Sequence, residues 1–359
     1  MTKRAAIILS GGRAERFQNT HQDWQDKALV KLLGKPLLVH VVENVKKVVE
    51  DTIVCVNTEN RKRQYTKILK KNKIKNVKLF IDEPCNRVSG PIAGILTGLI
   101  ASNADYCFTL PSDMPFFKPE VIEYMFNSAE NARAVVPMWP NGRLETLTMV
   151  LKKTEAREIA KTLCSLRRPR SDDIIRGALD VFLISTVSEI KALDPDLKSF
   201  ININSQADLA ILEPRQAQGP IINSIRLNLG DLSMSKLQNL QAASFFYNEG
   251  NFLEASKAFS SCATQLEKEA YYFWAAISHE NEGKSLLNYS KLHRKRANTG
   301  EQAERGRKAL LKASNVYELE AKIYDKFEGI FLAKRARSNK SWCESIVNNQ
   351  TDDISHFSH

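Results

Sequence analysis

Near its beginning the chain reads Ile7-Ile8-Leu9-Ser10-Gly11-Gly12-Arg13-Ala14-Glu15-Arg16-Phe17. The apolar run predicts a buried first strand, and the glycine pair ends that strand abruptly. Because glycine has no Cβ, backbone N–H groups of the pair can come close to a phosphate chain. The two arginines can place guanidinium groups on the same anion. The stretch therefore indicates a strand followed by a phosphate-binding loop.

This glycine pair fits neither of the two best-known phosphate-binding patterns. The chain has no G-x-x-x-x-G-K-[ST] sequence and no G-x-G-x-x-G sequence at this strand. Taken alone, a strand followed by two glycines is also typical of a plain tight turn. The segments that follow decide between the two interpretations.

Length and composition favour a two-domain globular protein. The chain has 359 residues, of which 43% are hydrophobic and 26% are charged. No apolar run approaches the ~20 residues that span a bilayer. The start, Met-Thr-Lys-Arg, leads directly into the first strand with no secretory leader. We therefore expect a cytoplasmic protein with no membrane partner.

The cysteines, histidines and charged residues indicate which metal sites, disulfides and partners to expect. The six cysteines and six histidines are scattered without metal-ligand spacing, so we expect buried or free thiols, no zinc and no disulfide framework. The net charge of +11 suits phosphorylated substrates. The basic stretch from Arg61 to Lys75 is expected to be an exposed helical face. Aromatic residues do not alternate with these charges, so nucleic acid is not favoured as a partner.

Residues 1–212 predict an α/β, Rossmann-like fold with a mostly parallel sheet covered on both sides. The expected strands share an apolar character and are Ala5–Leu9, Thr52–Val56, Val77–Ile81, Tyr106–Leu110, Ala134–Pro137, Leu147–Leu151 and Val181–Ile184. The expected helices between them are Leu37–Val49, Tyr65–Lys71, Pro91–Ser102 and Pro119–Ser128. In such sheets ligands lie beyond the carboxyl ends of the strands. The glycine pair, Asn57, Asp82 and Asp113 all fall there.

The composition changes after residue 212. Residues 213–234 contain prolines and glycines without a clear period and are expected to be a linker. Residues 235–347 predict an all-α helical bundle, and residues 348–359 a polar tail. Ala243 to Cys262 have the spacing of a tetratricopeptide-type hairpin with Gly250 at its turn. Such a hairpin can bind a client protein, and we expect residues 1–212 to fold without it.

Five later segments of the first 210 residues or so carry a resemblance. In order they read Asp26-Lys27-Ala28-Leu29; Gly34-Lys35-Pro36-Leu37-Leu38; Ser89-Gly90-Pro91-Ile92-Ala93-Gly94, which follows Asp82; Pro111-Ser112-Asp113-Met114-Pro115-Phe116; and Asn202-Ile203-Asn204-Ser205, which precedes Asp208-Leu209. Together with the opening glycine pair they resemble the MobA-like nucleotidyltransferases, and most closely the molybdenum cofactor guanylyltransferases. The resemblance implies a magnesium-dependent enzyme that moves GMP from GTP to molybdopterin and releases pyrophosphate.

The resemblance also implies roles for particular residues. Asp113 is expected to hold magnesium, since a carboxylate on a loop stiffened by two prolines suits that ion. Lys27 and Arg16 are expected to neutralise charge on the phosphates during catalysis. The expected nucleotide-binding residues are Leu9, Ser10, Gly11, Gly12, Arg13, Lys27, Asn57, Asp82 and Asp113. The expected acceptor-binding residues are Gly90, Pro91, Asn202 and Asn204, the two asparagines lying on one side of a strand.

Other functions stay open from the sequence alone. A sister enzyme could use CTP, and the acceptor could be another phosphorylated molecule, such as a sugar phosphate or a cobamide precursor. Ten residues, Phe17 to Asp26, separate Arg16 from Lys27, which is a longer link than the family commonly has. A protein of another class, a cofactor-binding scaffold or chaperone, would keep the fold without the catalysis.

Overall fold

The structure is a computed structural model that describes residues 2–11, 26–82, 90–204, 208, 220–231, 233–293 and 299–348. The chain packs as two compact units. The first, here the sheet unit, comprises residues 1–160, 169–171 and 180–227; the second, here the helical unit, comprises residues 161–168, 172–179 and 228–359. The expected domain limits at residues 212 and 234 stay predictions. Two short segments that precede residue 180, residues 161–168 and 172–179, pack with the helical unit.

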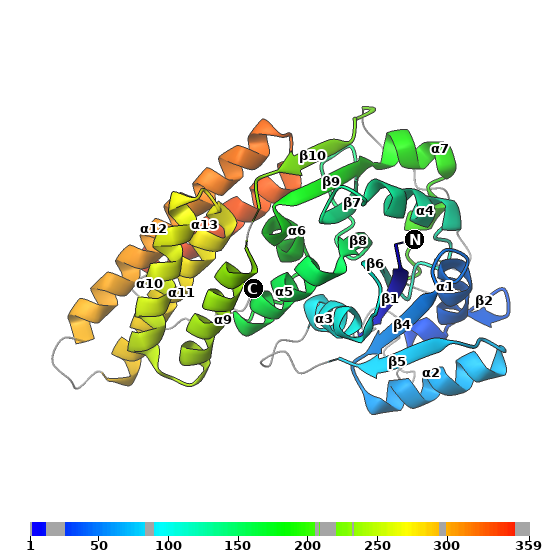
Figure 1. The fold of residues 1–359 in the computed structure, drawn as a ribbon, viewed down its shortest axis with the longest axis horizontal. Helices are drawn as coiled ribbons and strands as arrows, with labels where there is room; N and C mark the ends of the chain where they lie inside the picture. Colours follow the sequence, from blue (N-terminus) through cyan, green and yellow to red (C-terminus); the bar gives the residue numbers. More distant parts are fainter. Residues whose placement is uncertain are drawn as a thin grey trace. The chain divides into compact units, whose positions relative to one another are not determined.

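A mostly parallel sheet forms the centre of the sheet unit (Figure 1). Its described strands lie in the order β10-β9-β7-β8-β6-β1-β4-β5. Their bounds are β1 (Arg4–Ser10), β4 (Asp51–Val56), β5 (Val77–Ile81), β6 (Tyr106–Pro111), β7 (Ala134–Met138), β8 (Met149–Lys152), β9 (Asp180–Ser185) and β10 (Ile225–Asn228). Strand β8 runs antiparallel to its two neighbours, β6 and β7. The other pairs of this sheet whose direction is known, among the described strands, are parallel. The parallel α/β sheet expected from the sequence is confirmed.

Strand β1 lies inside the sheet because its residues are apolar on both faces. Ile7 pairs in register with Ile53 of β4 and Thr109 of β6. Ile8 belongs to a core cluster with residues of two helices, α1 (Leu37–Val45) and α4 (Pro119–Ser128). On the opposite face Ile7 contacts Gly98 of helix α3 (Pro91–Ala101). Helices therefore cover both faces of this strand.

Shorter elements complete the sheet unit. A hairpin is formed by β2 (Lys31–Leu32) and β3 (Lys35–Pro36), and helix α2 (Glu59–Lys71) connects β4 to β5. Helical turns lie at η2 (Lys27–Leu29), η3 (Thr186–Ile190), α7 (Lys191–Leu193) and η4 (Lys198–Phe200). Strand β10 lies inside the segment expected to be a linker. Residues 201–204 form no strand, so the strand expected around Asn202 and Asn204 is wrong.

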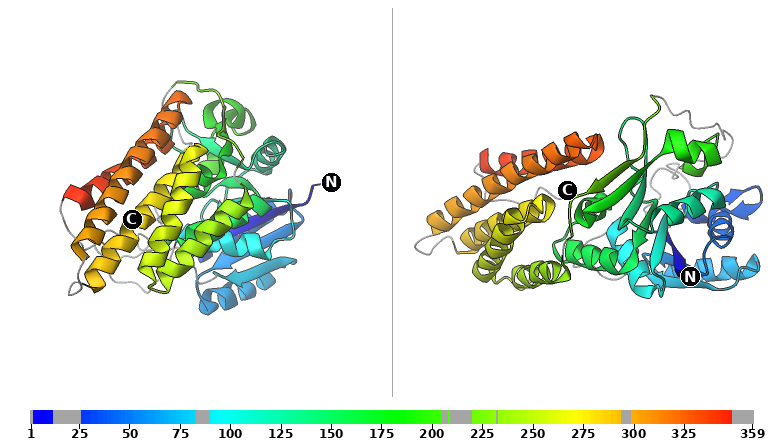
Figure 2. Two further views of the ribbon diagram at one scale, coloured as in Figure 1. Left: turned by 60° about the vertical axis from the view of Figure 1, so that its left-hand side comes forward. Right: turned by 45° about the horizontal axis from the view of Figure 1, so that its top comes forward.

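The helical unit contains five successive helices in the described part of the chain. They are α9 (Met234–Asn248), α10 (Phe252–Lys268), α11 (Tyr272–Leu292), α12 (Thr299–Lys326) and α13 (Ile330–Asn348). Figure 2 shows them side by side in chain order, from yellow-green to red. Gly250, with φ of +80°, makes the turn between α9 and α10. The bundle expected after residue 235 is confirmed.

The first two of these helices differ in length from the next two. Helices α9 and α10 have 15 and 17 residues, which suits a repeat of about 34 residues. Helices α11 and α12 have 21 and 28 residues, so the bundle is irregular beyond the first pair. The tetratricopeptide-type hairpin stays a prediction.

The helical unit also includes the last residues of α5 (Lys153–Ser165) and all of α6 (Asp172–Ala178). All seven residues of α6 are buried. Cys164, at the end of α5, is disulfide-bonded, so the expectation of buried or free thiols alone is wrong for this residue. Within the described residues, no helix combines the length and the apolar character needed to cross a membrane.

Candidate functional site

The carboxyl ends of four neighbouring parallel strands bring the candidate residues to one edge of the sheet. Ser10 ends β1, and Asn57, Asp82 and Ser112 directly follow β4, β5 and β6. The Ser112 N–H donates to the Leu9 carbonyl at 3.0 Å, and the Asp82 N–H donates to the Val56 carbonyl at 2.8 Å. These backbone bonds extend the ladders by one residue, so the side chains leave the sheet at fixed positions.

Lys27 gathers two candidate residues from distant parts of the chain. Its ammonium group forms an ion pair with the Asp113 carboxylate and donates a hydrogen bond to Asn204 Oδ1 at 2.6 Å. The Ile203 N–H donates to the Asp113 carbonyl at 3.0 Å, which fixes the segment of Asn204 beside Asp113. The side chains of Lys27 and Asp113 are 19% and 22% exposed, so both remain accessible to a ligand.

The oxygen atoms around Lys27 fit a magnesium ion. Asp113 supplies a carboxylate and Asn204 an amide oxygen, and hard oxygen donors are what magnesium binds. Among the described residues no cluster of three or more histidine, cysteine or acidic side chains could form an all-protein metal cage. Magnesium is commonly held by one or two carboxylates and by substrate phosphates, and Asp113 offers one such carboxylate.

A buried ion pair fixes the turn that carries Lys27. Asp26 accepts a hydrogen bond from the Ala28 N–H at 3.2 Å and so caps η2. Its carboxylate pairs with Arg61 Nε at 3.0 Å, and the side chains of Asp26 and Arg61 are only 4% and 6% exposed. Since both charges are shielded from water, their mutual pairing is needed to satisfy them.

Hydroxyl groups connect this ion pair to β6. The Ser112 hydroxyl donates to Ser10 Oγ at 2.9 Å, and the Ser10 and Tyr65 hydroxyls lie 2.7 Å apart. Tyr65 then donates to both oxygens of Asp26 at 3.0 Å. Burial raises the pKa of Tyr65 well above its ordinary value, so the phenol keeps the proton that it donates. The chain of bonds holds β1, β6 and η2 together.

Asn57 forms hydrogen bonds through both atoms of its amide. Its Nδ2 donates to the Gly11 carbonyl at 2.9 Å, and its Oδ1 accepts from Arg61 at 2.9 Å. Arg61 also donates to the Ser10 carbonyl at 3.2 Å. The amide supports the backbone at the end of β1, and its second N–H and the second lone pair of Oδ1 can still contact a base.

Asp82 offers a carboxylate without a hydrogen-bond partner for its buried Oδ1 among the described residues. Burial raises the pKa of Asp82 to about 6, although Arg61 lowers it in part. Two glycines make room for this carboxylate: a Cβ added at Gly11 would lie 3.1 Å from Oδ2, and one at Gly94 would lie 3.4 Å from Oδ1. An unsatisfied buried acceptor of this kind suits a ligand that brings hydrogen-bond donors.

The expected acceptor-binding residues fall in two places. Gly90 and Pro91 begin α3, and a Cβ added at Gly90 would lie 3.0 Å from the Pro169 carbonyl oxygen. Asn202 follows η4, and its Oδ1 is buried without a partner among the described residues. Asn204 instead accepts a hydrogen bond from Lys27, so the side chains of the two asparagines do not share a binding partner.

Three expected site residues, Gly12, Arg13 and Arg16, lie outside the described residues. Four others were missed by the sequence analysis and are structural members of the site: Asp26, Arg61, Tyr65 and Ser112. The expectation that Arg61 lies on an exposed face is wrong, since it is 5% exposed and paired with Asp26. Arg61, Tyr65 and Leu69 follow one another at intervals of four residues and are buried on one side of α2. This spacing in the sequence could have predicted that Arg61 faces the core.

Comparison with known proteins relates the first half of the chain to one family of nucleotidyltransferases. The pattern of the MobA-like NTP transferase domain matches residues 6–179. A probable molybdenum cofactor guanylyltransferase of Methanosarcina acetivorans is 32% identical over 207 residues, which cover 57% of this chain and 88% of that protein. Another from Pyrococcus horikoshii is 29% identical and covers 58% of this chain and 99% of that protein.

A solved structure with a similar arrangement is molybdopterin-guanine dinucleotide biosynthesis protein A from Archaeoglobus fulgidus. It is 23% identical and gives a TM-score of 0.47 over 58% of this chain and 96% of that chain. These three similarities involve at most 58% of the chain, and the family pattern ends at residue 179.

Proposed function

Since this chain belongs to the MobA-like NTP transferase family and is a nucleotidyltransferase of the molybdenum cofactor guanylyltransferase type, we propose that it transfers GMP from GTP to molybdopterin and releases pyrophosphate. The observation that carries the proposal is the meeting of Lys27, Asp113 and Asn204 beyond the sheet, in a chain 32% identical to a probable enzyme of this kind.

The residues around Lys27 supply the electrostatic part of the reaction. Negative charge grows on the leaving pyrophosphate, and the Lys27 ammonium is placed to neutralise it. Asp113, with Asn204 as a second oxygen donor, would hold a magnesium ion, which would supply further positive charge at the phosphates. Arg13 and Arg16 would add guanidinium groups to the same phosphates, as the family resemblance implies.

We assign base recognition to Asp82. Guanine presents two neighbouring donors, N1–H and the N2 amino group, and an ionised carboxylate accepts from both. The buried Oδ1 of Asp82, which has no hydrogen-bond partner among the described residues, supports this role, and so does the room that Gly11 and Gly94 leave around it. Leu9, Ser10 and Gly11 would contact base and ribose through their backbone, while Asn57 braces that backbone.

The acceptor is proposed to bind near the start of α3 and the segment of Asn202. Gly90 precedes that helix and Pro91, which has no N–H, is its first residue; the positive end of the helix dipole favours an anionic group such as the molybdopterin phosphate. The buried Oδ1 of Asn202 can accept a hydrogen bond from the acceptor. Because these substrates are soluble, we propose that the reaction takes place in the cytoplasm. We also propose, as a separate point, that the helical unit binds a client protein.

Two alternatives are less well supported. Cytosine presents one amino group and two acceptors on its pairing edge, so an ionised Asp82 suits it less well than guanine. A scaffold without catalysis would not need the Lys27–Asp113 pair, which is present.

Nucleotide binding tests the proposal. Titration calorimetry of the full chain with GTP, CTP and ATP, each with and without magnesium, should give the tightest binding for magnesium and GTP. Equal affinity for the three nucleotides would contradict base recognition by Asp82, and GTP affinity independent of magnesium would contradict the role of Asp113.

A further inference from the structure

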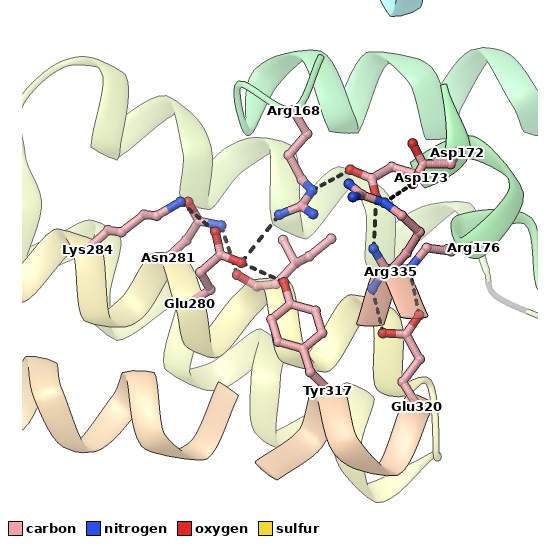
Figure 3. A network of polar contacts seen from close by, with 11 residues as sticks. Arg168, Asp172, Asp173, Arg176, Glu280, Asn281, Lys284, Tyr317, Glu320 and Arg335 are labelled. Atoms are coloured by element: carbon pink, nitrogen blue, oxygen red, sulfur yellow. Dashed lines mark hydrogen bonds and ion pairs between the residues drawn. The ribbon is translucent and has the colours of Figure 1, made fainter. Parts of the chain in front are cut away.

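Ion pairs deep inside the helical unit form a network that stays closed in the folded protein (Figure 3). The network includes charged side chains of α6, α11, α12 and α13. Within it, Arg176 forms two hydrogen bonds with the Glu320 carboxylate at 2.8 and 2.7 Å. The two side chains are 0% and 3% exposed, so water cannot replace either partner, and separating them would leave two buried charges unpaired. Pairs of this kind are permanent.

The ion pair of the candidate site is of another kind. Lys27 and Asp113 are 19% and 22% exposed, so water and ligands reach both side chains. The Lys27 ammonium is carried by a flexible four-carbon stem, which can swing without any change of the backbone. Because each partner can be solvated when the other leaves, this pair can open while the site stays folded.

The roles proposed for these two residues require the pair to open. Lys27 is to neutralise the phosphates, while Asp113 and Asn204 are to hold magnesium. Yet the Lys27 ammonium engages Asp113 Oδ2 and Asn204 Oδ1, which are oxygens that the metal needs. Two cations on the same oxygens repel each other strongly at such short range. Lys27 and magnesium therefore compete for one set of ligands.

The metal-binding oxygens stay together when Lys27 leaves. The Ile203 N–H donates to the Asp113 carbonyl at 3.0 Å, and the Asn204 N–H donates to Asp208 Oδ2 at 2.6 Å. Neither bond involves Lys27, and the turn that carries Lys27 is held separately by the buried ion pair described above. Only the lysine side chain has to move.

The phosphates of a nucleotide favour this movement. The lysine ammonium is a compact point charge that binds phosphate well, and a triphosphate offers it several negative oxygens. Magnesium gives up its waters reluctantly and is usually bound by one or two carboxylates together with substrate phosphates. One carboxylate and one amide alone are a weak metal site, against which Lys27 competes successfully.

We propose that Lys27 blocks the metal site: its ammonium holds Asp113 and Asn204 until the phosphates of GTP draw it away, so that the metal binds only together with the nucleotide. The proposal rests on the proposed function, because that function places metal and phosphates beside Lys27. Metal and nucleotide then raise each other's affinity by the same factor, as linkage requires.

The test measures metal binding to the full chain without nucleotide. Mn²⁺ takes the place of magnesium, because electron paramagnetic resonance counts the unbound ion. Lys27→Met removes the ammonium and keeps a long, unbranched side chain, while Lys27→Arg keeps the charge. Lys31→Met is the matched control, since Lys31 is an exposed lysine four residues further along the chain.

Lys27→Met should bind Mn²⁺ at least about tenfold more tightly than the wild type, because the competing cation is gone. Lys31→Met and Lys27→Arg should stay within about threefold of the wild type. Adding Asp113→Asn to Lys27→Met should abolish the gain. The proposal is overturned if Lys27→Met binds Mn²⁺ no more tightly than Lys31→Met, or if the gain survives the loss of the Asp113 carboxylate.

A second arm measures the affinity for metal-free GTP in the presence of a chelator. Asp113→Asn releases Lys27 for the phosphates, so this variant should bind metal-free GTP at least about fivefold more tightly than the wild type. Asp196→Asn, at an exposed carboxylate, should change nothing. Unchanged or weaker binding by Asp113→Asn would overturn the proposal, and this arm decides if Lys27→Met does not fold.

Failure of the proposed function is recognised separately. If the wild-type chain transfers GMP to no acceptor, the proposed function fails. The Mn²⁺ titration uses neither nucleotide nor acceptor, so it still decides whether Lys27 blocks a metal site at Asp113.

Discussion

At the scale of single residues, the proposed function makes transfer depend on the negative charge of Asp113. We predict that Asp113→Asn lowers kcat for GMP transfer by at least ~10²-fold, because the amide neither binds magnesium as well nor balances Lys27. The fold should persist, since the Ile203–Asp113 backbone bond does not involve the side chain. Steady-state kinetics and a melting curve measure both. Asp196→Asn, at an exposed carboxylate, is the control, and turnover of Asp113→Asn close to that control would contradict the assignment.

The Asp82 carboxyl group gives a pH dependence of known sign. Its raised pKa of about 6 means that the folded protein keeps this proton until the pH rises through about 6. Only the ionised form accepts from both guanine donors, so kcat/KM for GTP should increase across that pH.

The variant Asp82→Asn should lack this step in its pH profile. It should also lose about 1–3 kcal/mol of discrimination in favour of GTP over CTP, the range of a good bidentate contact to a base. Profiles of kcat/KM with both nucleotides between pH 5 and 8 provide the measurement. A variant that retains both the step and the preference for GTP would show that another group reads the base.

At the scale of elements, the packing of α3 on β1 depends on one glycine. A Cβ added at Gly98 would lie 2.3 Å from the Ile7 side chain, well inside any real contact. Gly98→Ala should therefore lower the free energy of unfolding by about 1–3 kcal/mol through overpacking. Gly300→Ala, on α12 with nothing within 4 Å, is the matched control and should be neutral or slightly stabilising. Urea unfolding of both variants decides, and equal effects would contradict the tight packing.

The sequence predicted the elements that have a strong local pattern. The apolar runs that form β1 and β4 predicted the parallel sheet, because a short continuous apolar run is typical of a strand buried on both faces. Strand β10 has four residues without such a run and depends on its place in the sheet, so its pattern was too weak. Arg61 was missed because basic residues around it dominate α2, while its partner Asp26 lies elsewhere in the chain.

At the scale of the whole molecule, long-range pairs were beyond sequence reasoning. The strand ends predicted where Asp82 and Asp113 lie, since parallel strands end at one edge. The contact of Lys27 with Asn204 joins residues 177 positions apart, and no local spacing encodes it. The network around Arg176 was invisible for the same reason, because its partner Glu320 is 144 positions away.

Ion pairs inside the helical unit lead us to a prediction that differs from the expectation that residues 1–212 fold alone. A fragment of residues 1–231 keeps β10 but removes Glu280, Glu320 and Arg335 from their partners Arg168, Arg176 and Asp172. Truncation also uncovers helix α6, all seven residues of which are buried in the full chain, so its apolar side chains lose the helices that shield them from water. We predict that the fragment aggregates or unfolds, and that residues 233–359 supplied in trans restore it.

Circular dichroism and size-exclusion chromatography of the fragment, with and without the second piece, test this prediction. A monodisperse, folded fragment with the turnover of the full chain would show that the helical unit is dispensable.

The account as a whole depends on which molecule receives GMP. The most direct measurement incubates the purified full chain with magnesium, GTP and metal-loaded molybdopterin, and follows pyrophosphate release together with the mass of the pterin product. We predict one pyrophosphate for each pterin that gains one GMP, with GTP preferred over CTP. A cytidine adduct formed in preference, or no adduct while GTP is bound, would contradict the account.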